Sequence, residues 1–288
     1  MTVNASNLVK SLSWLLLLAS SLAWSLDRGD FFAESEAHGA ANLRVLWVAS
    51  PGWAEAGADG QPHGLTIDLM REFARWLNET HGLEVSLDFV EEQDWRRFYD
   101  RVRDGEGGLF GLGNVTITEA RRRELAFSPP YVRNVAVLIS HADRAEIKQP
   151  QLMSDVLAGQ RAMAFAGTLH EQRLRALAEA HWPDLSLDFS NSNREILDAV
   201  AAGTHFAYVD GYNYLRARAE GAALRRHAAL DDPGERFGII MPLNNDWRFL
   251  LEAFFARDGG LMTSIWYRHL LESHLGHEVA ALVVPETD

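Results

Sequence analysis

Residues 43–48 read Leu-Arg-Val-Leu-Trp-Val, a run with the length and the β-branched content of a buried strand. Pro51 and Gly52 end this run, because proline lacks an amide donor and glycine favours a turn. After a loop to Gly64, apolar side chains recur at helical spacing over residues 65–77. The sequence therefore predicts a strand, a loop and a helix as the first unit of the fold.

The same succession recurs in both halves of the chain. Strands that alternate with helices favour mostly parallel sheets covered by helices on their faces, so we predict an α/β fold with two such halves. Sheets of this kind bind ligands beyond the carboxyl ends of their strands. The further predicted strands are 85–90, 162–166, 185–189 and 205–209, and the predicted helices are 95–102, 174–178 and 196–202.

The first 25 residues have the layout of a secretory signal peptide. Lys10 is the only charge there, and it precedes a short apolar run and a zone of small residues. An uncleaved anchor or a buried helix is the alternative, but the run is shorter than the roughly 20 apolar residues that span a bilayer. We therefore expect a signal peptide over 1–25, a periplasmic or other extracytoplasmic location, and a flexible leader over 26–41 that lacks sustained periodicity.

The composition excludes several classes of protein. The formal charge of -13 repels phosphate backbones, so no nucleic-acid partner is expected. The chain has no cysteine, which removes disulfides, thiol catalysis and thiolate metal sites. The 11 histidines lack ligand spacing, and no nucleophile elbow, zinc-protease motif or phosphate-binding glycine loop is present. We expect no metal, no cofactor and no catalytic residue, and a monomeric binding protein rather than an enzyme.

A more specific pattern lies near the middle of the chain. Residues 113–121 read Gly-Asn-Val-Thr-Ile-Thr-Glu-Ala-Arg, and residues 127–131 read Phe-Ser-Pro-Pro-Tyr. This stretch resembles the polar-amino-acid type of bacterial periplasmic solute-binding proteins, solute-binding protein family 3, with the pattern T-I-T-x-x-R followed by F-S-x-P-Y. Matches of this kind extend from about Leu43 to about Gly276.

The resemblance implies a type II periplasmic binding fold, in which two lobes are joined by two hinge crossings. Lobe 1 would comprise 42–138 and 238–288, and lobe 2 would comprise 139–237. It also implies capture of a small amino-acid-like ligand by lobe closure, on behalf of an ABC permease or a sensor partner.

Two charged residues are the main candidates for ligand contact. A free amino acid carries a carboxylate and an ammonium, and a closed cleft must match both charges. By resemblance Arg121 holds the carboxylate, for which its guanidinium offers two parallel donors, and Asp210 holds the ammonium. The alternatives are a solvated arginine face for Arg121 and a turn aspartate before Gly211 for Asp210.

Four further residues are expected near the ligand. Thr116 and Thr168 are candidate neutral donors, although Thr168 is equally well placed to cap a helix. Asn114 is a secondary polar contact. Trp53 stands near the position of the family's usual aromatic wall, and a surface tryptophan is the alternative.

Two other functions remain open. Some proteins with this fold are cyclohexadienyl dehydratases, and Glu171 lies close enough to the Thr168 turn to be considered as a general acid. Membrane-bound lytic transglycosylases carry a similar binding domain, and residues 181–186 look somewhat like theirs. Because only about a dozen residues follow Gly276, we expect no lytic domain, and a free-standing sensory binding domain is the alternative to transport.

Overall fold

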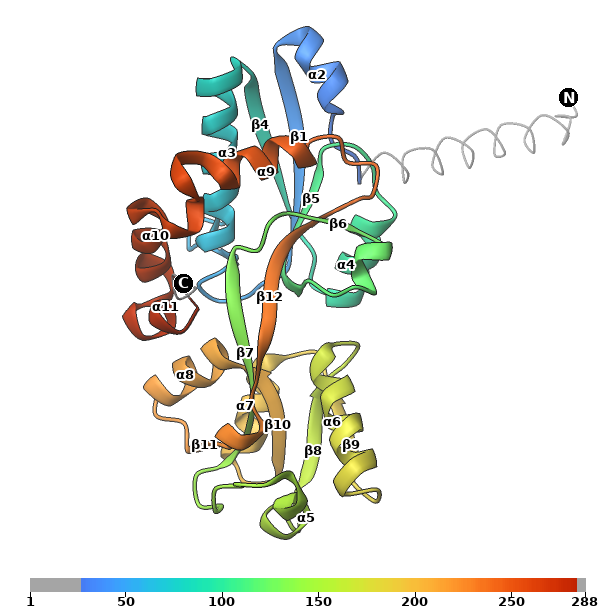
Figure 1. Ribbon diagram of the computed structural model, residues 1–288, viewed down its shortest axis with the longest axis vertical. Helices are drawn as coiled ribbons and strands as arrows, with labels where there is room; N and C mark the ends of the chain where they lie inside the picture. Colours follow the sequence, from blue (N-terminus) through green and yellow to red (C-terminus); the bar gives the residue numbers. More distant parts are fainter. Residues whose placement is uncertain (1–26, 284–288) are drawn as a thin grey trace, which may run out of the picture.

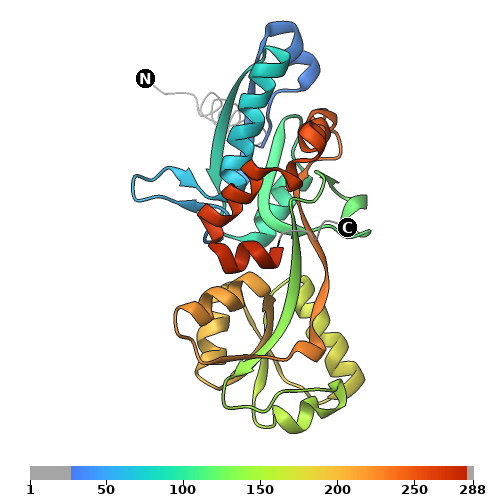
Figure 2. The same ribbon diagram turned by 60° about the vertical axis from the view of Figure 1, so that its left-hand side comes forward.

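The computed structural model describes residues 27–283, so the expected signal peptide lies outside the described residues. The molecule is elongated and has two lobes that meet at a narrow waist, with two long strands running between them (Figures 1 and 2). The N-terminal and C-terminal parts of the chain build lobe 1, and the middle part builds lobe 2 (Figure 1). The predicted two-lobed α/β fold is therefore confirmed.

Lobe 1 is built on a parallel sheet in the order β4-β1-β5, with helices on both faces. Its longest helix, α3, ends at Gly82, whose left-handed φ of 67° places its amide on the carbonyl groups of the last turn. The elements of lobe 1 are β1 (Ala40–Trp47), β2 (Glu55–Ala56), β3 (Pro62–His63), α3 (Leu65–His81), β4 (Glu84–Glu91), α4 (Trp95–Arg103), β5 (Leu109–Thr116), β6 (Ala126–Phe127), α9 (Arg248–Ala256), α10 (Ile265–Leu275) and α11 (His277–Val283).

Lobe 2 has a second sheet, in which β10, β8 and β9 run parallel. Its apolar clusters are formed by its own sheet and helices. The elements of lobe 2 are α5 (Met153–Val156), β8 (Arg161–Phe165), α6 (Leu169–His181), β9 (Leu187–Ser190), α7 (Asn193–Ala201), β10 (His205–Asp210), α8 (Gly211–Ala219) and β11 (Leu224–Arg226). None of the helices described in either lobe is long and apolar enough to cross a bilayer.

Two antiparallel strands, β7 (Val132–His141) and β12 (Asp232–Met241), connect the lobes and join their sheets. Toward lobe 1, β12 pairs with β5 from residue 237 onward, and toward lobe 2, β7 pairs with β10 from residue 136 onward. The chain thus passes between the lobes at residues 132–136 and 232–237. These segments lie up to a few residues before the lobe boundaries that we expected after residues 138 and 237.

The expectation of a flexible leader is wrong for residues 27–41. They form a short helix, α2 (Phe32–His38), and the beginning of β1. Asp27 pairs with Arg101 at 2.6 Å, and the Asp246 carboxylate accepts from the amide of Phe32 at 2.8 Å. These partners lie 74 and 214 positions away, so no local sequence pattern reveals them.

Asp246 also accepts from the amide of Ala33 at 3.2 Å and so caps α2 from a distant part of the chain. We predict that Asp246→Ala lowers the free energy of unfolding by about 1 kcal/mol, the usual effect of losing a helix cap. Amide hydrogen exchange should accelerate over 32–38, whereas Glu252→Ala on the surface of α9 should leave it unchanged. Equal exchange in both variants would contradict this assignment.

Candidate functional site

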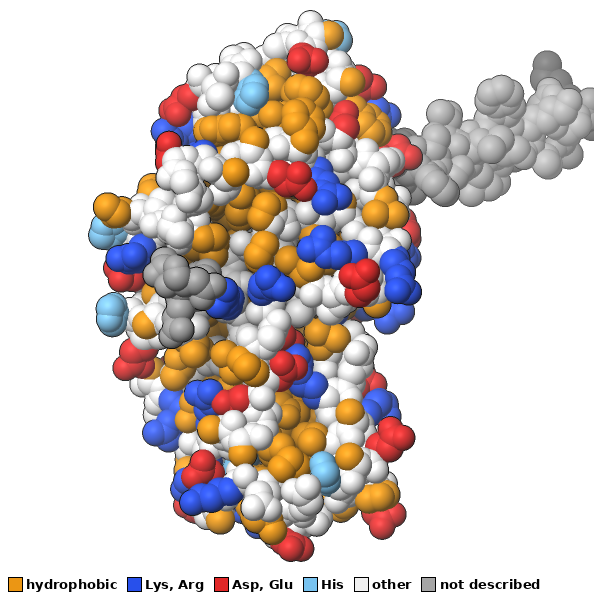
Figure 3. Space-filling model, viewed as in Figure 1, with side chains coloured by type: hydrophobic (Ala, Val, Ile, Leu, Met, Phe, Trp, Pro, Cys, Tyr) orange, Lys and Arg blue, Asp and Glu red, His pale blue; other side chains and the backbone are white. Residues whose placement is uncertain are grey.

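A cleft of about 940 Å³ lies between the two lobes, and residues from both lobes line it. The space-filling view shows the molecule narrowing at the waist between the lobes (Figure 3). Of the six residues expected to contact a ligand, the lining includes all but Trp53. The lining residues expected from the sequence are Asn114, Thr116 and Arg121 from lobe 1 and Thr168 and Asp210 from lobe 2.

Arg121 lies on a single 3-10 turn that follows β5. Its Nη1 donates to the carbonyl of Thr116 at 3.0 Å, and its guanidinium faces the rings of Trp95 and Tyr99 at 5.5 and 5.8 Å. No carboxylate within residues 27–283 forms an ion pair with it, and burial lowers its pKa by removing it from water. The turn therefore holds a half-buried cation at the cleft, without a matching anion among residues 27–283.

The other two arginines that line the cleft differ from Arg121 in this respect. Arg194 lies 3.7 Å from Asp198, and Arg216 lies 4.0 Å from Glu220, each pair on its own helix. These are exposed helix pairs of the kind that contribute little. Arg121 is thus distinguished from them by both its burial and its missing partner among the described residues.

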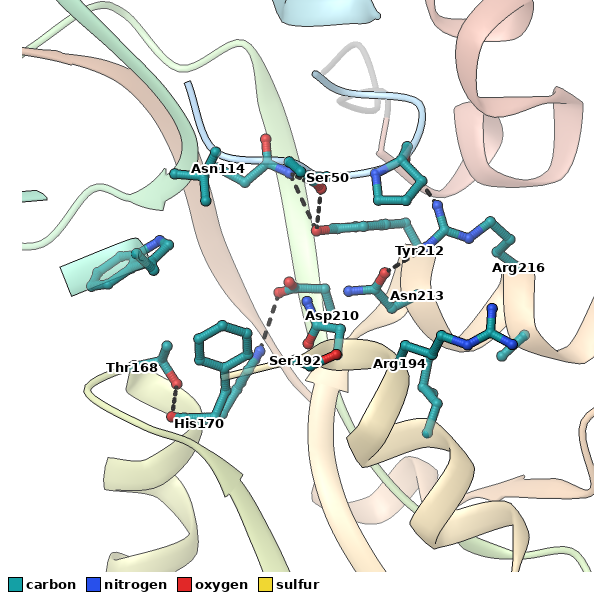
Figure 4. A pocket seen from close by; sticks show the side chains of 18 of the residues that line it. Ser50, Asn114, Thr168, His170, Ser192, Arg194, Asp210, Tyr212, Asn213 and Arg216 are labelled. Carbon is teal, nitrogen blue, oxygen red and sulfur yellow. Dashed lines mark hydrogen bonds and ion pairs between the residues drawn. The ribbon is translucent and has the colours of Figure 1, made fainter. Parts of the chain in front are cut away.

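Asp210 is the last residue of β10 and precedes α8, but its side chain does not cap that helix. Its Oδ1 accepts from Asn134 Nδ2 at 2.6 Å and lies 3.3 Å from His170 Nε2, as the dashed line to His170 in Figure 4 shows. The described residues provide no hydrogen bond to Oδ2. The turn-aspartate alternative therefore does not account for this residue, and one carboxylate oxygen remains available to a ligand.

His170 connects Asp210 to a second charged group. Its Nδ1 lies 3.3 Å from Nη1 of Arg173, and a guanidinium can only donate. The histidine Nδ1 must therefore accept, which places the proton of the neutral ring on Nε2, facing Asp210. Sequence analysis missed His170, because a single histidine two positions after a turn carries no pattern.

The hinge strands hold a buried acidic residue next to this group. Glu235 on β12 is paired in register with Asn134 on β7, and the Asn134 amide donates to it at 2.5 Å. Arg173 on α6 forms ion pairs with Glu235 at 2.6 Å and with Asp232 at 2.7 Å. The register of β12 with β7 shifts between these two acidic residues. Asn134 therefore binds two carboxylates at once, that of Asp210 and that of the hinge residue Glu235.

Thr168 stands at the start of α6, where its hydroxyl donates to the carbonyl of Phe165 at 2.8 Å and does not cap the helix. The first turn of α6 thus faces the cleft without a cap from this side chain. Glu171 instead accepts from the amide of Gly167 at 2.9 Å and pairs with Arg175. These two partners lower the pKa of Glu171, so it stays ionised and is poorly suited to act as a general acid.

Asn114 adopts a left-handed backbone with φ of 51°, which asparagine tolerates better than most residues. Its Nδ2 lies 3.2 Å from the hydroxyls of Ser50 and Tyr212 (Figure 4). Its Oδ1 accepts a hydrogen bond from Tyr131 at 2.9 Å. Both ends of its amide are therefore engaged within the protein.

The expected aromatic wall is not formed by Trp53. This side chain is 1% exposed, does not line the cleft, and packs in lobe 1 against Tyr131, Tyr212 and Phe237. The cause is Tyr212, which comes from lobe 2 and covers the indole at a ring separation of 5.1 Å. Trp95 is the tryptophan that lines the cleft, beneath Arg121.

With this geometry in place, residues 47–217 match the model of the bacterial extracellular solute-binding proteins, family 3. The chain belongs to this family. Within residues 27–283, no group of histidine, aspartate or glutamate side chains is arranged to hold a metal ion.

One curated relative is the membrane-bound lytic murein transglycosylase F of Saccharophagus degradans (strain 2-40 / ATCC 43961 / DSM 17024). It is 29% identical over 114 residues, which cover 40% of this family 3 chain and 21% of the transglycosylase. The chain thus matches about a fifth of the length of that relative.

Solved structures share the fold at low identity. An ancestral arginine-binding protein bound to arginine has a TM-score of 0.63 at 19% identity, covering 82% of this chain and 98% of the other. The GluR0 ligand-binding core from Nostoc punctiforme in complex with glutamate has a TM-score of 0.60 at 19% identity, covering 82% and 100%. An ancestral amino-acid-binding protein described as a precursor of cyclohexadienyl dehydratase has a TM-score of 0.62 at 20% identity, covering 84% and 98%.

The Arg173 group yields a prediction about stability. Glu235 is only 4% exposed, so Arg173→Ala would leave a buried carboxylate without its cation. We predict a loss of about 3 kcal/mol in the free energy of unfolding, measured by urea denaturation. Arg175→Ala, on the same helix but with a 58% exposed side chain, should lose less than about 1 kcal/mol. A loss of equal size in the two variants would show that the buried pair has no special role.

Proposed function

We propose that this family 3 protein captures a small amino-acid-like ligand in the cleft between its lobes and does not transform it. The observation that carries this proposal is Arg121, a desolvated cation at the cleft without an anion among the described residues. A ligand carboxylate would supply the missing charge through two parallel hydrogen bonds. The uncapped first turn of α6, in the opposite lobe, offers backbone amides to the same anion.

Asp210 supports the second half of the proposed recognition. Among the described residues no donor occupies its Oδ2, so this oxygen is available to the ligand ammonium. Arg121 and Asp210 belong to different lobes, so a ligand that carries both charges would bind the lobes to one another. Lobe closure around the ligand follows as part of the proposal.

Two observations guide the choice of first ligands. The solved structures with the same fold include proteins bound to arginine and to glutamate. The lining of the cleft carries five carboxylates against three guanidinium groups, so charge complementarity favours basic over acidic amino acids. Arginine and lysine are therefore the first ligands to test.

The role served by capture has two candidates. Delivery to an ABC permease follows from the family, and a sensory role is favoured by the match to part of a lytic transglycosylase. Catalysis of the dehydratase kind receives no support from Glu171, whose carboxylate is held ionised by Gly167 and Arg175.

The charge pair leads to a binding prediction. A calorimetric screen of the 20 amino acids should yield a saturable ligand, and Arg121→Ala and Asp210→Asn should each weaken it by roughly 30-fold or more. Arg123→Ala is the matched control, because this arginine lies on the same turn and is exposed. Without ligand, Arg121→Ala should melt at about the temperature of the parent, since no ion pair is lost.

The deamino analogue of the ligand separates the two roles. It retains the carboxylate, so its binding should depend on Arg121 but hardly on Asp210. If both variants bind the parent ligand as tightly as the unmodified protein does, the cleft assignment is wrong.

We also propose that the protein acts outside the cytoplasm, as the Lys10 and apolar-run pattern of residues 1–25 predicts. Intact-mass analysis of protein from the cell envelope should then show a chain shortened by about these residues. Recovery of the full-length chain from the cytosol would contradict the proposed export.

A further inference from the structure

Tyr212 belongs to lobe 2 by its position on α8, but its side chain is part of the core of lobe 1. It is 4% exposed and joins the largest apolar cluster of lobe 1, where its ring lies 5.1 Å from that of Trp53. Tyr131 and Phe237 complete an aromatic recess around the same indole. This cluster thus extends into both lobes and includes Leu215 from the next turn of α8.

The hydroxyl of Tyr212 is also bound by lobe 1. It lies 3.2 Å from Nδ2 of Asn114 and 3.5 Å from Oγ of Ser50, and Figure 4 shows the three groups converging. Asn114 holds this geometry through its left-handed backbone and through its hydrogen bond from Tyr131. The recess therefore matches both the ring and the polar end of the tyrosine.

Two more contacts join the lobes on the same side of the cleft. Arg216, one turn after Tyr212 on α8, donates to the carbonyl of Pro51 at 2.9 Å. Helix α11 of lobe 1 lies against α8, where a Cβ added at Gly211 would come within 2.9 Å of Leu282. The absence of a side chain at position 211 thus allows the two helices to approach.

We propose that Tyr212 is a cross-lobe plug, which fills the aromatic recess of lobe 1, keeps ligand side chains out of it, and joins the lobes before any ligand binds. The plug stands over Trp53, which explains why the tryptophan expected to contact the ligand is buried. A tyrosine in such a recess contributes both the burial of its apolar ring and the hydrogen bonds of its hydroxyl.

The plug has two consequences for binding. If the lobes are already joined on one side, a smaller closing movement is left for the ligand to drive, which raises its apparent affinity. An aromatic ligand side chain would have to displace Tyr212 to reach Trp53, so such ligands are disfavoured. The second consequence rests on the proposed function, whereas the first can be tested without any ligand.

Lobe spacing is measured by pulsed electron paramagnetic resonance between spin labels on the two lobes. Because the chain has no cysteine, Glu79→Cys on α3 and Glu179→Cys on α6 would carry the only labels, and both positions are exposed. In ligand-free protein, Tyr212→Ala should shift and broaden the distance distribution relative to the parent. Tyr212→Phe, which keeps the ring, should shift it less.

Tyr214→Ala is the matched control, because Tyr214 lies on the same helix and packs within lobe 2. Should Tyr212→Ala fail to fold, Leu282→Ala weakens the same junction from lobe 1 without altering the cleft lining. An unchanged distribution in the variants of Tyr212 and Leu282 that fold would overturn the plug as a lobe contact.

The ligand part is tested with L-phenylalanine and L-tryptophan as probes. Tyr212→Ala should bind at least one of them about tenfold more tightly than the parent, a ratio equivalent to about 1.4 kcal/mol. Equal affinity, or no binding by either protein, would show that the recess is not a side-chain subsite. The binding prediction for Arg121 remains independent of this outcome, so the two proposals fail separately.

Discussion

The antiparallel pairing of β7 with β12 is the interaction on which the rest of the structure depends. These are the strands that carry the chain out of lobe 1 and back, and their register sets how the two sheets face one another. At the middle of the crossing, Asn134 and Glu235 are directly paired, and their side chains meet the end of β10 at Asp210. The strand pairing that joins the lobes thus also orients the acidic end of the cleft.

The electrostatics of the cleft follow from how each charge is compensated. Glu235 is buried but has Arg173, and Asp210 has Asn134 and His170, whereas Arg121 has only a carbonyl and two aromatic rings among the described residues. A partly buried cation in such surroundings is less favourable until an anion arrives. The site is therefore organised so that an anionic group improves the solvation of Arg121 at the same time as it binds.

Sequence reasoning predicted those parts of the fold that depend on local pattern. The strand at 43–48 and the helix beginning at Leu65 correspond to β1 and α3 within a few residues, because burial imposes periods of two and 3.6 on such segments. The candidate Arg121 was found through a motif. By contrast, α2 was missed because its N-terminal cap comes from Asp246, a contact that no local pattern encodes.

The residues of the site were likewise predictable only where a motif or a local pattern identifies them. Thr168 follows β8 and Asp210 ends β10, and the carboxyl ends of strands in these sheets face the cleft. Their position in the chain and the resemblance to family 3 together identified them. The burial of Trp53 was not predictable, because it depends on a tyrosine from the other lobe. Residues that act between lobes, such as Tyr212 and Asn134, are recognisable only once the lobes are placed against one another.

The remote capping of α2 by Asp246 has a consequence for the order in which the chain folds. The strands and helices of lobe 2 come from one continuous segment, whereas lobe 1 requires its N-terminal helix to meet residues that are 214 positions later. Loop-closure entropy makes such distant contacts slow to form. Lobe 2 can therefore assemble while the chain is still emerging, and lobe 1 must wait for residue 246 before its first helix is capped.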